Sequence, residues 1–360
     1  MSNIVTNVLL LALAMKTFRY RLSFTTPAFL GNASQQAQWR TPPVKALLRQ
    51  WWRVAVAQEM GYCVERLRQR ENQLFGTAAD GEGDSRRSLV RIRLGQWNEG
   101  KLKDWASTGT VTHPEVRQPV GSDRYLGFGP LENNRDSRST AIKNKAAIQA
   151  GDTNILSIAV PEEHASHIAT ALWLMDRYGT LGGRSRNGWG SFSLRPADDS
   201  TAALQGKLPT KPWEDALQHD WTHAIGSDAQ GALVWQTAAF DDWKKLMQEL
   251  ARLKIALRTQ FRFPHERPDG RVHDRHWLSY PVTTHKVTDW DKNNARLPNS
   301  LRFKVRPAPN DPQKLVGMVF HVPCLPPPIF QPRLQAIESV WQTVHAFLDK
   351  PEQKLTRVPA

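Results

Sequence analysis

Residues 155–194 read ILSIAVPEEHASHIATALWLMDRYGTLGGRSRNGWGSFSL, and the order of patterns within them indicates the class of fold. The first six residues form an apolar, β-rich run, which is typical of a buried strand. Acidic residues after Pro161 suit the positive end of a helix, and apolar residues then recur at helical spacing until Gly179. A glycine-rich loop follows, and residues 189–194 are predicted to form a strand.

The residues before this stretch show the same order of strand and helix. Apolar and polar side chains alternate over residues 18–24, which indicates a half-buried strand. A helix is predicted to begin at Thr41 with proline in its first turn, and residues 90–94 alternate again. The order is therefore β-α-β-β-α-β, with an irregular basic insertion near 96–150. We predict an α+β protein whose first domain, residues 15–200, is ferredoxin-like (RRM-like).

The second half of the chain carries weaker patterns. Residues 201–230 are predicted to be a linker, and residues 231–360 a second, degenerate ferredoxin-like domain. Apolar stripes at helical spacing predict helices near 243–257 and 333–349. Strands are predicted at 233–237, 277–283, 301–306 and 315–322.

The first fourteen residues differ in character from the rest of the first domain. Residues 8–14 are apolar but too short to cross a bilayer, and no cationic segment of a signal peptide precedes them. We interpret residues 1–14 as an extra N-terminal segment upstream of the true start at Met15, with a short additional helix as the alternative. No membrane partner is expected.

The charge of the chain favours a polyanionic partner. The formal net charge is +14 over 360 residues, and the basic excess is shared by both halves. Only Cys63 and Cys324 are present, so neither a disulfide framework nor a cysteine-rich metal site is expected. A reducing, cytoplasmic location follows as the default.

The glycine-rich loop is the first candidate binding site. It lies between a helix and a strand, whereas nucleotide-binding loops lie between a strand and a helix, so bound ATP or NAD is not expected. Glycines allow close backbone approach, so N–H groups of the loop and its two arginines could bind phosphates. A purely structural turn fits the composition equally well. The predicted binding residues are Gly182, Gly183, Arg184, Arg186, Gly188 and Gly190.

Two further basic clusters are candidates for binding RNA. On the first helix, three cations recur every four residues beside a tryptophan that could stack on a base. Other cations lie in the flexible loop 76–88 and in the insertion. A solvated basic face, or disordered loops, would explain them equally. The residues are Lys45, Arg49, Trp52, Arg53, Arg86, Arg87, Arg138, Lys143 and Lys145.

Histidines are candidate catalytic groups, because metal-free cleavage of RNA needs an acid and a base. His265, His273, His276 and His285 cluster in sequence, but without the spacing of a zinc motif. No nucleophile elbow or carboxylate metal cluster is evident. We therefore predict no catalytic residue, no metal and no cofactor.

Several segments, in one order, resemble a known family. Residues 26–31 (TPAFLG) and 39–53 (WRTPPVKALLRQWWR) look like the start of the first subunit of the Cmr (type III-B) CRISPR complex. Residues 74–76 (LFG), 125–129 (YLGFG) and 182–191 (GGRSRNGWGS) resemble motifs of the RAMP superfamily. The matches span about residues 17–195.

The resemblance implies two ferredoxin-like domains and a non-catalytic, RNA-binding subunit of a type III effector complex in antiviral defence. It implies contact with the 3′ part of the guide RNA, with target RNA and with other RAMP subunits. Two alternatives stay open. The chain could be a guide-RNA-processing endoribonuclease of the same superfamily, using His273 or His276, or a scaffold that contacts only proteins.

Overall fold

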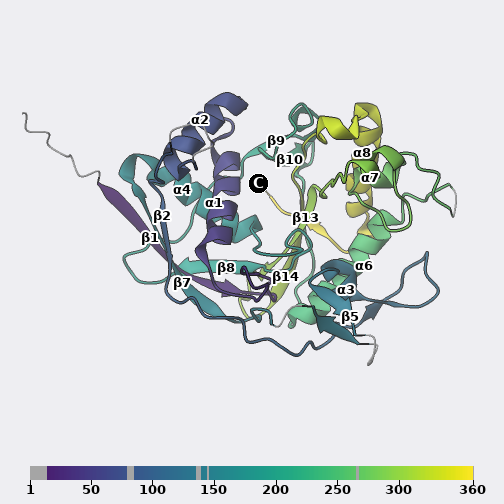
Figure 1. Ribbon diagram of the computed structural model, residues 1–360, viewed down its shortest axis with the longest axis horizontal. Helices are drawn as coiled ribbons and strands as arrows, with labels where there is room; N and C mark the ends of the chain where they lie inside the picture. The colour runs from purple at the N-terminus through teal and green to yellow at the C-terminus, as the bar shows by residue number, and fades with distance from the viewer. Residues whose placement is uncertain (1–13, 79–84, 135–138, 144–145, 265–266, 360) are drawn as a thin grey trace, which may run out of the picture.

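The computed structural model describes residues 14–78, 85–134, 139–143, 146–264 and 267–359, and it confirms the α+β class. Two four-stranded antiparallel sheets each carry two long helices (Figure 1). The N-terminal segment predicted to precede the true start lies outside the described residues, except for Ala14. No helix in the described ranges is long and apolar enough to cross a membrane.

The first sheet has the strand order β2-β7-β1-β8. Alternation in the first strand buries Phe18, Tyr20, Leu22 and Phe24 on one face, where helices cover them. Each neighbouring pair of strands is antiparallel. The predicted order of strands and helices is therefore confirmed. The elements are β1 (Met15–Phe24), α1 (Thr41–Val56), α2 (Val64–Phe75), β2 (Arg91–Leu94), β7 (Thr153–Pro161), α4 (Ala165–Tyr178) and β8 (Phe192–Pro196).

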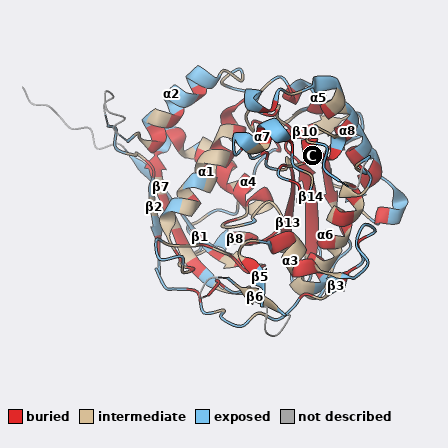
Figure 2. Cartoon of the chain, turned by 45° about the vertical axis from the view of Figure 1, so that its right-hand side comes forward, coloured by how far each residue is buried: buried red, intermediate tan, exposed pale blue. Residues whose placement is uncertain are grey.

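The second sheet has the order β13-β14-β12-β15, so its strands occupy the same sequential positions as those of the first. Both predicted helices are present. Figure 2 shows that β13 and β14 are buried in the middle of the molecule. The elements are β12 (Val234–Gln236), α6 (Trp243–Arg258), α7 (Thr288–Lys292), β13 (Leu301–Pro307), β14 (Leu315–His321), α8 (Leu334–Leu348) and β15 (Thr356–Arg357).

Two predictions for the second half need correction. Residues 277–283 are not a strand: they begin at the end of the 3-10 helix η2 (Asp274–Trp277), and Pro281 offers no N–H for a ladder. Residues 201–230 are a folded connection rather than an irregular linker, because Trp213 and Leu217 are buried. Their elements, with the first strand after them, are β9 (Thr210–Pro212), α5 (Trp213–Ala216), β10 (Ile225–Asp228) and β11 (Gly231–Ala232).

The insertion after β2 belongs to the first half of the chain but packs on the second. Helix α3 contacts α6, and Leu126, Leu131 and Trp189 lie in the same apolar cluster as the buried face of α6. The two halves thus share a core. The elements of the insertion are β3 (Thr110–Val111), β4 (Val120–Gly121), α3 (Ser122–Gly127), β5 (Leu131–Asn133) and β6 (Thr140–Ile142).

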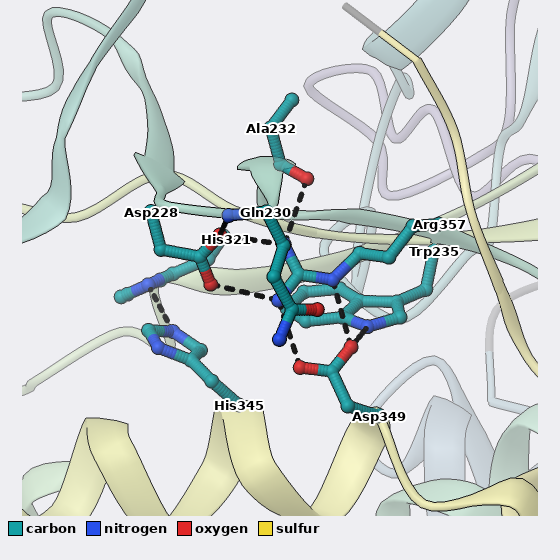
Figure 3. A network of polar contacts seen from close by, with 8 residues as sticks. All are labelled: Asp228, Gln230, Ala232, Trp235, His321, His345, Asp349 and Arg357. Carbon is teal, nitrogen blue, oxygen red and sulfur yellow. Dashed lines mark hydrogen bonds and ion pairs between the residues drawn. The ribbon is translucent and has the colours of Figure 1, made fainter.

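A polar network closes the edge of the second sheet (Figure 3). Arg357 on β15 forms ion pairs with Asp228, at 2.8 Å, and with Asp349, at 2.7 Å. The indole N–H of Trp235 donates to the same Asp349 carboxylate. Strand β15 is therefore anchored by side chains from β10, β12 and the end of α8.

Candidate nucleic-acid interface

The glycine-rich loop lines a cleft of about 1840 Å³. The insertion supplies one side of this cleft, through residues between 113 and 133. The end of α6 and the segment that follows it supply the other, through residues 254–264 and 275–299. Loop residues 184–187 lie between these two sides, so three distant parts of the sequence build one cavity.

The cleft is strongly basic. Among the described residues that line it, Glu115 is the only carboxylate, and both of its oxygens lie 2.8 Å from Nη1 of Arg275. An excess of unpaired cations in a concave surface focuses a positive potential and attracts polyanions. The lining cations are Arg124, Arg184, Arg186, Lys254, Arg258, Arg262, Arg275 and Arg296.

The glycines of the loop allow close packing within the protein. A side chain at Gly190, where φ is +65°, would place its Cβ 1.8 Å from the carbonyl oxygen of Leu181. A Cβ at Gly182 would lie 2.7 Å from the carbonyl oxygen of Phe29. Both positions therefore require glycine for steric reasons.

The predicted use of glycine N–H groups for phosphates is wrong at three positions. The N–H of Gly183 donates to Phe29, that of Gly188 to Ser185 and that of Gly190 to Pro27. These donors are already satisfied by protein carbonyls, which is the usual state of a backbone group packed against its own fold. The binding capacity of the loop lies in its side chains.

Both loop arginines line the cleft, as the binding prediction requires. Nε of Arg184 donates to the carbonyl of Phe128, and Nη1 of Arg186 donates to the carbonyl of Asn299 at 3.1 Å. Burial lowers the pKa of both guanidinium groups. Each arginine has five N–H donors, so these contacts orient the side chain and leave further donors for a ligand.

Helix α6 brings two more cations to the loop. Nζ of Lys254 donates to Oδ1 of Asn187 at 2.6 Å, and Nδ2 of that asparagine donates to the carbonyl of Leu126. Arg258 lies one turn further along. Burial, together with repulsion from Arg258 and Arg184, lowers the pKa of Lys254 to about 7. A bound anion would relieve this repulsion.

Sequence reasoning missed the cations of the second half. Attention to the apolar stripe of α6 hid the basic pair Lys254 and Arg258, whose i, i+4 spacing was the available signal. Arg262 and Arg296 are exposed at the cleft and flank the segment that was wrongly predicted to contain a strand.

The basic stripe of the first helix lies outside the residues that line the cleft. Lys45 donates to the carbonyl of Phe75, and Arg49 and Arg53 both bind the buried carboxylate of Glu71 at 2.7 Å. These three cations already stabilise the packing of α1 on α2. Their predicted contact with RNA stays a prediction.

The stacking role predicted for Trp52 is wrong. Its side chain is 1% exposed, and its ring packs edge-on against Phe75 with 5.6 Å between ring centres. No face of this indole is open to a base. The tryptophan belongs to the core that α1 shares with the first sheet.

The loop cations are dispersed. Arg86 and Arg87 are exposed near the end of α2, and the backbone of Arg86 pairs with Thr77. Lys143 is exposed, and its N–H donates to the carbonyl of Pro130. All three lie outside the lining of the cleft. Arg138 and Lys145 lie outside the described residues.

Three histidines gather around Phe263 beside the cleft, while His265 lies outside the described residues. Nδ1 of His276 accepts from the backbone N–H of His273, and its Nε2 donates to the carbonyl of His285. Both ring nitrogens of His276 are therefore occupied. Within the described ranges, no three His, Cys, Asp or Glu side chains are grouped so as to hold a metal ion.

The comparisons with known proteins identify the class. The model of the RAMP superfamily matches residues 21–193, so the chain carries a RAMP-superfamily domain. All the motifs quoted for the resemblance lie within this range. The predicted relation to this superfamily and to the first subunit of the Cmr complex is confirmed.

The individual relatives are distant. The Cmr subunit Cmr1-2 of Pyrococcus furiosus is 23% identical over 185 residues, which cover 49% of this chain and 94% of that protein. The crystal structure of apo Cmr1 from the same organism matches with a TM-score of 0.46 and 14% identity, over 96% of this chain and 99% of that one. A chain of the Type III-B Cmr-beta complex bound to cognate target RNA matches with a TM-score of 0.44 and 11% identity, over 92% and 99%.

Proposed function

We propose that this protein is an RNA-binding subunit of a type III-B-like CRISPR ribonucleoprotein, and that the basic cleft holds the RNA. The observation that carries the proposal is the convergence of eight cations from three parts of the sequence on one cavity. RNA backbones carry one negative charge per nucleotide, so such a cavity suits them. The relation to a Cmr subunit supports the assembly into which it would fit.

The RNA would be the 3′ part of a guide RNA together with target RNA, and the neighbours would be other RAMP subunits acting in antiviral defence. The shared strand order of the two sheets supports a further inference about layout, namely that both units are ferredoxin-like. Their boundaries would fall near residues 15–200 and 231–360.

We infer that the subunit is not catalytic. The support is the occupation of both ring nitrogens of His276 by protein partners, which leaves neither for a substrate hydroxyl. Incubation of the purified protein with repeat RNA tests this inference. Specific cleavage that disappears in His273→Ala would contradict it and favour the endoribonuclease alternative.

Two exposed arginines of the cleft allow a direct test of RNA binding. Arg262→Gln/Arg296→Gln should weaken the binding of a guide–target RNA by about tenfold and reduce the slope of log K against log salt by roughly 1.4, since each lost phosphate contact removes about 0.7. Binding is measured by fluorescence anisotropy at several salt concentrations.

The matched control is Arg91→Gln/Arg93→Gln, which removes the same charge from exposed positions on β2, outside the cleft. Equal effects of the two double variants would mean that general charge, and not the cleft, attracts the RNA. Crosslinking of RNA elsewhere, or to other subunits alone, would favour the protein-only scaffold.

A further inference from the structure

Phe128 is the most exposed large apolar side chain of the described residues, at 68%. It lines the basic cleft, where it follows helix α3 directly. Val116, another exposed apolar residue, lines the same cleft. Exposing an aromatic ring forgoes the favourable free energy of its burial, so a ring held in this position suggests a ligand that covers it.

The backbone beneath this ring is tightly held. A Cβ at Gly127 would lie 2.8 Å from Leu131 and 3.0 Å from the indole nitrogen of Trp189, so the chain packs against the core immediately before Phe128. Gly129, immediately after it, has a φ of +113°, and its N–H donates to the carbonyl of Leu131. The ring is therefore presented from a fixed position and loses little freedom when a ligand binds.

The immediate neighbour of the ring is a cation of the cleft. Arg184 donates from Nε to the carbonyl of Phe128, and its terminal nitrogens lie near Gly129. A nucleotide would place its phosphate at such a guanidinium and its base on the adjacent ring. Bases have apolar faces that stack on aromatic side chains without regard to sequence.

We propose that Phe128 is a stacking platform for an unpaired base, and that the cleft therefore prefers single-stranded RNA to duplex. This inference rests on the proposed binding of RNA in the cleft. A duplex stacks its bases on one another, so a ring at the side of the cleft cannot reach a base face there. An apolar protein partner is less suited to this position, because it would cover Arg184 without neutralising it.

The test compares full-length wild-type protein, Phe128→Ala and Phe128→Trp, each checked for unchanged thermal unfolding. Three probes are used: a short single-stranded RNA, the same strand in a duplex, and an abasic strand of equal length. Phe128→Ala should weaken single-strand binding about tenfold and leave duplex and abasic binding unchanged. Phe128→Trp should retain the affinity, and the salt dependence should not change, because stacking releases no counterions.

The Arg262→Gln/Arg296→Gln variant separates the two proposals. If it weakens binding while Phe128→Ala has no effect, or lowers the affinity for all three probes alike, the stacking role is overturned and the RNA-binding cleft stands. If the wild-type protein binds none of the probes, both fail. If Phe128→Ala impairs assembly with partner subunits while RNA binding is intact, the ring is a protein contact and the inference is wrong.

Discussion

Nζ of Lys304 lies 2.7 Å from the carbonyl oxygen of Gly179, and it also donates to the carbonyl of Met175 at 2.9 Å. A fully buried cation on β13 thus caps the C-terminal end of α4, where helix carbonyls lack partners and the helix dipole is negative. This contact links the second sheet to the helix that leads into the glycine-rich loop. Burial lowers the pKa of Lys304 to about 7.

Lys304→Met should lower the free energy of unfolding by about 1–3 kcal/mol, because two buried carbonyls lose their donor. Urea unfolding followed by circular dichroism measures the change. Lys314→Met, at an exposed position, is the control and should change stability by less than about 0.5 kcal/mol. An unchanged stability of Lys304→Met would show that the cost of burying the lysine offsets its hydrogen bonds.

Arg49→Gln/Arg53→Gln should reduce stability more than it reduces RNA affinity. Burial disfavours the Glu71 carboxylate, but hydrogen bonds from Arg53 and Arg49 outweigh it and lower the pKa of Glu71. Without the two arginines, a buried carboxylate is left unpaired, at a cost of roughly 1–3 kcal/mol. Unfolding midpoints and RNA titrations on the same samples decide between the roles. Lost RNA binding at unchanged stability would restore the predicted RNA contact of this stripe.

The stability of the second unit should fall as the pH falls from about 6.5. Nε2 of His345 lies 2.9 Å from Nδ1 of the buried His321. Burial lowers the pKa of His345 to about 4 and that of His321 well below its usual value. Between pH 6.5 and 4 the unfolded chain therefore binds protons that the folded protein does not, which favours unfolding. Thermal unfolding between pH 6.5 and 5 should show this slope, and His345→Gln should reduce it.

RNA affinity should decrease between pH 6 and pH 8.5. Lys254 has a pKa of about 7 in the free protein, so it is charged at the lower pH and largely neutral at the higher one. Only the charged form attracts phosphate, and bound phosphate would in turn raise its pKa. Titrations at constant ionic strength measure the trend. Lys254→Gln should weaken binding at pH 6 and flatten the dependence; an unaltered pH profile in this variant would assign the trend to another group.

Short-range patterns predicted most of the secondary structure. Alternation marked β1, and the apolar stripes marked α4, α6 and α8, since each buried face has the period of its own element. The segment 277–283 failed because its apolar residues are buried by neighbours distant in sequence and not by strand pairing. Periodicity cannot distinguish these two reasons for burial.

The candidate site was predictable only in part. The loop arginines were found because glycines and cations are adjacent in sequence. Lys254, Arg258 and Phe128 reach the same cleft from other elements, and only the tertiary fold brings them together. Trp52 shows the opposite failure: a tryptophan beside cations fits a stacking role, but the helix turns its ring into the core.

The packing of the insertion on α6 also bears on how the chain folds during synthesis. The insertion and the glycine-rich loop leave the ribosome before α6, yet Leu126, Leu131 and Trp189 are buried in the cluster that α6 completes. Until α6 emerges, these side chains lack their cover and are open to wrong contacts. A fragment ending near residue 200 should therefore aggregate, so functional dissection of this protein requires point substitutions rather than separate halves.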